Sequence, residues 1–243
     1  GAFLAGLVLS IPIIGPIIRA IVRLVAEVVS QIAGIVDAIA RFFGIRITKH
    51  LRICIIILEA ENHQHVADPG DLTAAIEFAK TAFYDGAKVR LHVLGIHKVN
   101  SPAPRDTLDV NTDAGAVLDE LFLPGSYFET AANGYCFDEA ASRLLAIGSP
   151  VVVFVVRSVA GQATGCSLLT FTDYVTVERG TFKGRSADPT VMGHEIAHAC
   201  TLIHFDNPNN LMFPTSTAGT LRGSRLTPIQ STLFRNSRHV TFL

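Results

Sequence analysis

The sequence contains no tryptophan, few charged residues and no excess of charge of either sign. Charged residues make up only 17% of the 243 residues, and the formal net charge at pH 7 is −1. Proteins that bind nucleic acids usually carry a basic patch or stripe, and no such run of Lys and Arg occurs here. We therefore expect no nucleic-acid partner. The length allows one large domain, or a domain with an accessory segment.

Cysteine is also scarce, and no two cysteines form a CxxC pair. The four are Cys54, Cys136, Cys166 and Cys200. Without a CxxC pair, a structural zinc site is not expected. Three fully paired disulfide connectivities are possible, and the sequence does not choose among them. Cys136 and Cys166 lie in glycine-containing loop sequence and are the best candidates for one disulfide, whereas Cys200 is expected to be a packed core thiol.

The pattern that indicates function is a histidine pair near the C-terminus, His194-Glu195-Ile196-Ala197-His198. Residues four apart share one face of a helix, so His194 and His198 are expected to point toward one spot. Imidazole is a common zinc ligand, and a catalytic zinc site keeps one position open for water. Glu195, beside the first histidine, could act as general base toward that water. The pattern predicts a catalytic zinc site.

The choice of a third zinc ligand is limited by a further absence, because no glutamate occurs after Glu195. The only later carboxylates are Asp206 and the C-terminus. His204 is therefore the favoured third ligand, and Asp206 is the alternative. His204 lies too far along the chain to share the helix face of His194, so a sharp turn is expected between them.

These residues resemble the motif of the metzincin zinc peptidases, HExxHxxGxxH followed by a Met-turn. The matching residues are His194, Glu195, His198, His204 and Met212. The resemblance implies that the three histidines bind one Zn²⁺, that the glutamate is the catalytic base, and that the methionine lies beneath the metal without coordinating it. Residues 210–214, Asn-Leu-Met-Phe-Pro, are similar to the Met-turn of the matrixin branch.

One position departs from this family motif. Thr201 stands where the family has glycine. That glycine gives the end of the helix a backbone conformation that a β-branched residue adopts only with strain. Phe205, directly after the third histidine, also differs from the best-known branches. We therefore class the chain as an outlying metzincin-like sequence.

The resemblance also implies how a substrate would bind. Residues 173–178 alternate as expected for a strand at the edge of a sheet, and such an edge could align an extended peptide by strand addition. The substrate-contacting residues on this strand would be Tyr174, Val175 and Thr176. The pocket beyond the cleaved bond would be walled by Phe213, Pro214 and Thr215.

The pattern of elements predicts an α+β fold for residues 45–243, which we take as the catalytic domain. Strands are expected at 51–58, 89–93, 151–156 and 173–178. Helices are expected at 71–83, 117–121, 137–145 and 226–238, and a further helix that begins at Asp188-Pro189 is expected to carry His194 and His198. This order is that of the metzincin-like zincin fold, with a mixed twisted sheet, an active-site helix, a Met-turn and a C-terminal helix. His239, in a basic tail, is expected at the surface. His63 and His65 are expected in a solvated loop, and a second metal site is the alternative for them.

Residues 1–44 are predicted to form a separate hydrophobic helical segment. Residues 1–18 carry no charge, but Pro12, Gly15 and Pro16 make them a poor transmembrane helix. Over residues 17–43 the polar side chains recur in one narrow stripe, and the rest of the helix perimeter is apolar. A surface helix normally has a narrower apolar face. The alternatives are that this segment packs against residues 1–16 in a helical hairpin, or that it contacts the catalytic domain, a membrane or another subunit.

The sequence thus favours a zinc-dependent endopeptidase that uses one Zn²⁺ and acts on a protein or peptide substrate. The alternative is a membrane-inserting or translocated effector, in which residues 1–44 associate with the membrane and the zinc domain is the cargo. The chain begins with Gly1 rather than Met. We therefore expect a processed form, from which an original targeting signal can have been removed. We expect a secreted or membrane-associated protein.

Overall fold

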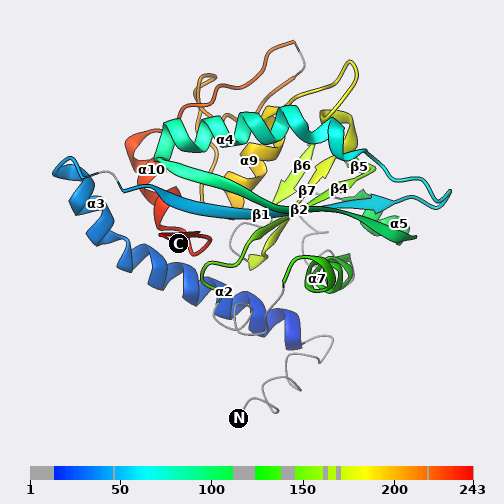
Figure 1. Ribbon diagram of the computed structural model, residues 1–243, viewed down its shortest axis with the longest axis horizontal. Coiled ribbons are helices and arrows are strands. Elements are labelled where there is room, and N and C mark those ends of the chain that lie inside the picture. Colours follow the sequence, from blue (N-terminus) through cyan, green and yellow to red (C-terminus); the bar gives the residue numbers. More distant parts are fainter. Residues whose placement is uncertain are drawn as a thin grey trace.

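The computed structural model describes residues 14–45, 47–111, 124–137, 146–160, 164–167, 171–217 and 219–242. The strands of its central sheet are β1 (Lys49–Glu59), β2 (Val89–Pro102), β4 (Val151–Val156), β6 (Gly165–Ser167), β7 (Tyr174–Glu178) and β8 (Val240–Thr241). The order is β2-β1-β4-β7-β6, with β8 paired to β1 (Figure 1). β1, β2, β4 and β7 are parallel, whereas β6 and β8 are antiparallel to their neighbours. A separate pair consists of β3 (Asp109–Val110) and β5 (Ser158–Val159).

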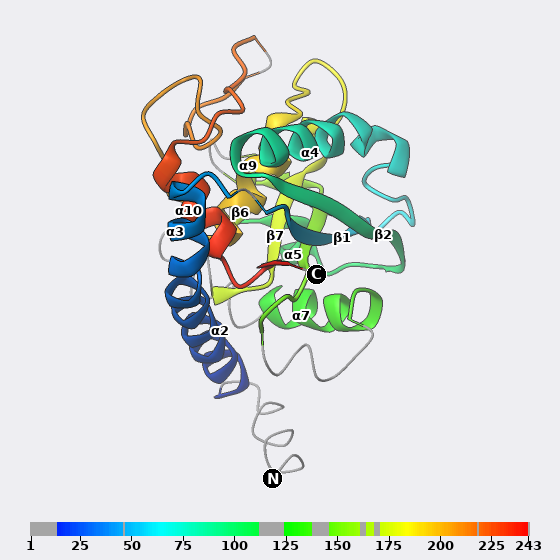
Figure 2. The same cartoon turned by 60° about the vertical axis from the view of Figure 1, so that its left-hand side comes forward.

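The two central strands are unbroken apolar runs because both faces of the sheet are covered. Residues 53–58 of β1 and every residue of β4 are at most 1% exposed. Parallel strands buried on both faces show such continuous Ile and Val runs instead of alternation. α4 (Thr73–Ala87) and α9 (Thr190–Ala199) lie over one face, and α7 (Pro124–Tyr135) lies over the other (Figure 2). The strands predicted at 51–58 and 151–156 and the mixed sheet are confirmed.

The remaining described helices lie around this sheet. They are α2 (Ile14–Ala33), α3 (Ile35–Phe42), η1 (Pro69–Leu72), α5 (Arg105–Leu108), η3 (Arg179–Thr181) and α10 (Pro228–Asn236). α4, α9 and α10 confirm three predicted helices. α7 was not predicted, because its glycines and aromatic residues are weak helix formers. Most of the predicted helices at 117–121 and 137–145 lies outside the described residues.

The prediction that residues 173–178 form an edge strand is wrong. β7 lies between β4 and β6, and residues 174–177 are at most 6% exposed. The alternation of Tyr and Thr with Val indicated a half-exposed strand, yet helices cover both faces. β6 forms the end of the sheet beside β7, and three residues are too few for a sequence pattern to reveal.

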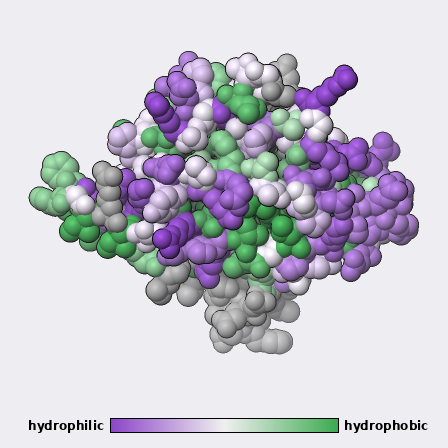
Figure 3. Space-filling view, turned by 45° about the horizontal axis from the view of Figure 1, so that its top comes forward, coloured by the Kyte–Doolittle hydropathy of each residue, from purple (hydrophilic) through white to green (hydrophobic). Residues whose placement is uncertain are grey.

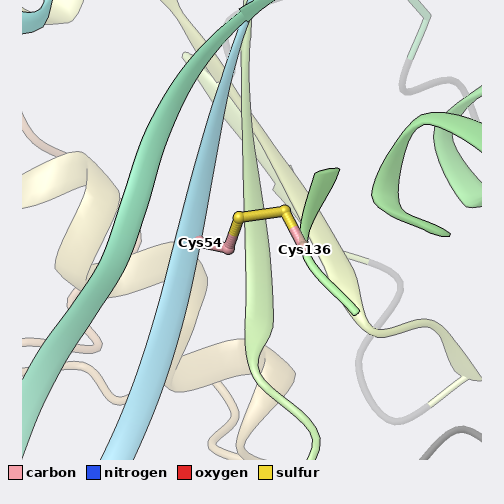
Figure 4. Close-up of a disulfide and its surroundings, with 2 residues drawn as sticks. All are labelled: Cys54 and Cys136. Carbon is pink, nitrogen blue, oxygen red and sulfur yellow. A yellow bond between two sulfur atoms is a disulfide. The ribbon is translucent and has the colours of Figure 1, made fainter. Parts of the chain in front are cut away.

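The disulfide also differs from the sequence-based expectation. Cys54 of β1 is bonded to Cys136 at the end of α7, with their Cα atoms 5.8 Å apart (Figure 4). Cys166 on β6 is not disulfide-bonded, and neither is Cys200, which is fully buried, as expected of a packed core thiol. No pattern in the sequence indicated that α7 brings Cys136 against β1. Closing a loop between residues 82 apart stabilises the fold by roughly 4 kcal/mol in the chain-entropy description.

The polar stripe of α2 and α3 faces the rest of the protein. Arg23 forms ion pairs with Asp173 at 2.7 Å and Glu129 at 2.8 Å. Asp37 receives two hydrogen bonds from the fully buried Arg235, at 2.7 and 2.8 Å. The helices therefore attach through their charged side, and their apolar side is turned outward.

The C-terminal residues complete this attachment. Glu27 of α2 accepts hydrogen bonds from the backbone of Arg238 at 3.0 Å and from Ser237 at 3.2 Å. The prediction that His239 lies at the surface is wrong, because the basic tail is buried beneath α2. Burial lowers the pKa of His239 to about 3, and its Nδ1 donates to the Ser149 carbonyl.

Among the described residues, no helix combines the length and the apolar character that crossing a membrane requires.

Candidate metal centre

Helix α9 and the turn after it bring three histidines together. His194 and His198 are one turn apart on α9, and His204 follows the helix. One ligand nitrogen from each lies within 4.8 Å of the others. Zinc binds imidazole nitrogen at about 2.0–2.1 Å, so three such atoms can close on a single ion. No other group of His, Cys, Asp or Glu with this geometry occurs in the described part of the chain, His63 and His65 included.

Backbone carbonyls orient the first two histidines for metal binding. The Nδ1 of His194 donates to the Leu211 carbonyl at 2.8 Å, and that of His198 donates to the Leu202 carbonyl at 2.6 Å. Each ring therefore carries its proton on Nδ1, and the two bare Nε2 atoms face each other at 3.0 Å. Such hydrogen bonds fix the tautomer of metal-binding histidines. Two lone pairs directed at one point fit a cation between them.

Burial keeps these histidines in the neutral form that metal binding requires. The pKa of His194 is lowered to about 2 and that of His198 to about 4, in both cases chiefly because of desolvation. The pKa of His204 is lowered for the same reason. The nearby Arg222 guanidinium lowers all three further. Neutral imidazole is the ligand form, so the site meets the protonation requirement.

Thr201 makes the sharp turn that the sequence required. Its φ is +74°, in the left-handed region. The amide of Leu202 donates to the Ala197 carbonyl at 3.0 Å, and that of Thr201 donates to the His198 carbonyl at 2.9 Å. This pair of bonds is the Schellman motif, in which glycine normally holds the left-handed position. A threonine therefore takes the glycine conformation, and the turn returns the chain so that His204 reaches the other two histidines.

We expect Thr201→Gly to be more stable than Thr201→Ala by about 1 kcal/mol, because alanine keeps the left-handed strain and glycine removes it. Both substitutions lose the Thr201 hydroxyl and its hydrogen bond to Cys200, which makes them a matched pair. Urea unfolding measures the difference. Glycine should also retain zinc, and a strong loss of zinc in that variant would contradict the observed turn.

Asp206, the alternative third ligand, is exposed and does not belong to the histidine cluster. Met212 lies in a turn beside the cluster, with a backbone hydrogen bond from Phe213 to Asn210. Its side chain is fully buried. The preceding carbonyl, that of Leu211, is the one that orients His194. The turn thus supports the cluster through the backbone.

Residues that were not predicted hold this turn in place. The Asn210 side chain accepts from the Met212 amide at 2.8 Å and donates to Gln230 at 2.7 Å. Gln230 belongs to a capping box with Thr227 at the start of α10. The Thr-Pro-Ile-Gln sequence fits the capping-box pattern, so this link to α10 had a detectable signal.

Glu195 lies beside the histidines in a dry environment. It is 6% exposed, and burial raises its pKa to about 8, although the Arg222 charge opposes this. Its neighbour is β6, because a Cβ added to Gly165 would lie 2.5 Å from Glu195 Cγ. A positive ion among the histidines would lower this pKa.

A cavity of about 630 Å³ connects these groups. Its walls are Thr164, Gly165, Cys166, Ser167, His194, Glu195, His198, His204, Pro214, Thr215, Ser216, Thr217 and Arg222. Of the predicted substrate-contacting residues, Pro214 and Thr215 line it. Phe213, Tyr174, Val175 and Thr176 do not. The β6 residues and Arg222 were missed, since neither carries a recognisable motif.

No protein-family model matches this chain, and no curated protein matches it. The chain is similar to the crystal structure of metalloproteinase-II from Bacteroides fragilis, with a TM-score of 0.44 and 16% identity, over 75% of this chain and 50% of that one. It is also similar to a chain of a chaperone–substrate complex, with a TM-score of 0.47 and 12% identity, over 79% of this chain and 34% of that one. The chain thus spans half or less of either protein. At this level, neither likeness identifies an activity.

Proposed function

We propose that this protein is a zinc-dependent endopeptidase of the metzincin type. The observation that carries the proposal is the cluster of three neutral histidines, two of them oriented by backbone carbonyls, with the buried Glu195 beside it. His194, His198 and His204 would hold the ion. The turn around Met212 would be the Met-turn.

The residues divide the proposed chemistry between them. Zinc, when bound, supplies Lewis-acid activation of a water molecule and of the scissile carbonyl. Glu195 accepts the proton of the attacking water and then delivers it to the leaving amine. A positive ion among the histidines would lower the pKa of Glu195 and hold the carboxylate in the ionised form that can accept this proton.

The substrate would be a peptide in extended form. We place it against β6, which ends the sheet and lines the cavity, in place of the buried β7. An antiparallel edge strand can bind a peptide through backbone hydrogen bonds. Pro214 and Thr215 would form the wall of the pocket beyond the cleaved bond. The disulfide between Cys54 and Cys136 supports a secreted location, because disulfides persist in oxidising compartments.

The test combines metal analysis of the purified protein with hydrolysis of a library of denatured proteins. The proposal requires bound zinc, cleavage of the library, inhibition by 1,10-phenanthroline and recovery on adding zinc. Absence of cleavage by the zinc-loaded protein would refute it. A second candidate, a membrane-acting or translocated effector with the zinc domain as cargo, is favoured by the outward apolar side of α2 and α3.

A further inference from the structure

Arg222 is a buried cation in the cavity wall, and two nitrogen atoms of its guanidinium have no hydrogen-bond partner among the described residues. It is 7% exposed and lines the cavity together with the three histidines and Glu195. Its Nε and Nη1 atoms are buried and make no hydrogen bond with any described residue. Desolvation lowers its pKa. An unpaired buried charge is unfavourable unless a partner arrives, and such groups in native structures usually have a role.

No carboxylate in the described part of the chain pairs with the guanidinium of Arg222. Asp188 and Glu195 are the acidic groups that influence Arg222, yet neither forms an ion pair with it within 4 Å in the described structure. One oxygen of Asp188 instead accepts from the amide and the hydroxyl of Thr190, at 2.9 and 2.6 Å, at the start of α9. The guanidinium therefore lies in the cavity wall, and its Nε and Nη1 donors have no acceptor among the described residues.

We propose that Arg222 binds a carboxylate of the substrate next to the scissile bond, an inference that rests on the proposed peptidase function. A guanidinium presents a planar fork of donors that matches a carboxylate, and a charge-assisted bond is strong in a dry site. The cavity of about 630 Å³ leaves room for a side chain. The carboxylate is either that of an Asp or Glu side chain or that of the peptide C-terminus.

Matched peptides separate these sources. One pair carries Glu or Gln at each position flanking the scissile bond, and the other ends in a free or an amidated C-terminus. The wild type should prefer the carboxylate form of one pair by about 10- to 100-fold in kcat/KM. Arg222→Met should reduce that ratio to about one. Arg225→Met, at an exposed position on the same segment, should keep the ratio of the wild type.

Two results would overturn this role for Arg222. One is an unchanged ratio in Arg222→Met. The other is an equal loss of kcat on the carboxylate and amide peptides, which would assign Arg222 to the transition state. Calorimetric binding of the same peptides to zinc-loaded Glu195→Ala protein tests Arg222 without hydrolysis. If the wild type cleaves nothing, tighter binding of the carboxylate peptide still supports the inference, and equal binding contradicts it.

A second observation concerns α2 and α3, whose outward side is continuously apolar. The exposed residues are Ile17, Ile21, Val22, Leu24, Val25, Val28, Val29, Ile32, Ile35, Val36, Ile39, Phe42 and Phe43. Phe42 and Phe43 are 87% and 75% exposed at the end of α3. Figure 3 shows hydrophobic residues gathered at this tip of the molecule. The two helices together span roughly 40 Å, given the rise of 1.5 Å per residue.

The charges on these helices indicate what covers this side. Their acidic residues, Glu27 and Asp37, are buried, and so is Arg23. Arg19 and Arg41 are partly exposed. Arg19 lies 3.9 Å from Glu129 of α7. On the exposed side of the two helices the described charged side chains are basic and none is acidic. An anionic surface is complementary to both arginines.

We infer that α2 and α3 lie on a membrane surface that contains anionic lipid, with the apolar side in the interface. The buried ion pairs of Arg23 and Asp37 hold the helices flat against the protein, so the whole apolar side can meet one plane. Interfacial helices bind through such a combination of apolar area and basic residues. Long basic side chains can extend from the apolar layer toward the headgroups.

Flotation of the full chain with phosphatidylcholine vesicles, with and without phosphatidylglycerol, tests this inference. The wild type should float, and more of it should float when phosphatidylglycerol is present. The triple variant Val25→Glu, Val29→Glu, Val36→Glu changes only exposed side chains and should bind about ten-fold less. Leu94→Glu, at an exposed position on β2, should float like the wild type.

Light scattering in the absence of lipid measures whether the protein instead forms a dimer through this side. A wild type that stays with the dense fraction in both vesicle preparations would overturn the inference. A stable dimer that the triple variant converts to a monomer, without flotation, would assign this side to self-association.

Discussion

Glu195→Ala is expected to abolish peptide hydrolysis and to leave the zinc content of the protein unchanged. The three histidines remain, and the Nδ1 bonds of His194 and His198 to backbone carbonyls do not involve the glutamate. Loss of a positioned general base costs about 10²- to 10⁴-fold in rate. Hydrolysis of a fluorogenic peptide by the zinc-loaded proteins measures the effect, and elemental analysis measures the zinc.

Glu195→Gln is the matched control for this substitution, because it keeps the size of the side chain and removes only the base. Both variants should be inactive with normal zinc content. Activity equal to the wild type in either, after contaminating protease has been excluded, would remove Glu195 from the mechanism. Loss of zinc in both would show that the glutamate holds the site together instead of acting on water.

His204→Ala is expected to weaken zinc retention strongly, and Asp206→Asn is expected to leave it unchanged. His204 supplies the third nitrogen within 4.8 Å, whereas Asp206 lies outside the cluster. With only two protein ligands the ion would lose part of the three-ligand set of a catalytic zinc site. Competition with a chromogenic chelator measures the zinc affinity of both variants.

His204 is more exposed than the other two histidines, so its removal should disturb the fold little. Urea unfolding of the metal-free variant should therefore resemble that of the metal-free wild type. The reverse pattern, with zinc lost in Asp206→Asn and kept in His204→Ala, would mean that Thr201 directs the chain differently from the observed turn.

Local patterns in the sequence were sufficient to predict the histidine cluster and the buried strands. The spacing of His194 and His198 follows from helix periodicity, and the absence of later glutamate left His204 or Asp206 as the third ligand. The Ile and Val runs of β1 and β4 indicated buried strands. These features depend on residues close together in the chain, so periodicity and composition can reveal them.

Other features depend on residues far apart in the chain, and only the tertiary structure decided them. Cys136 meets Cys54 because α7 packs across the sheet. β7 is internal because the three residues of β6 cover its edge.

The sequence by itself determined that residues 17–43 form an amphipathic helical segment with one narrow polar stripe. It did not determine which side of that segment faces the protein, because an apolar side normally packs inward. Here the buried guanidinium of Arg235 pairs with Asp37 of α3. The buried Arg23 of α2 pairs with Asp173 and Glu129. The cost of burying unpaired charge therefore turns the polar stripe inward and the apolar side outward.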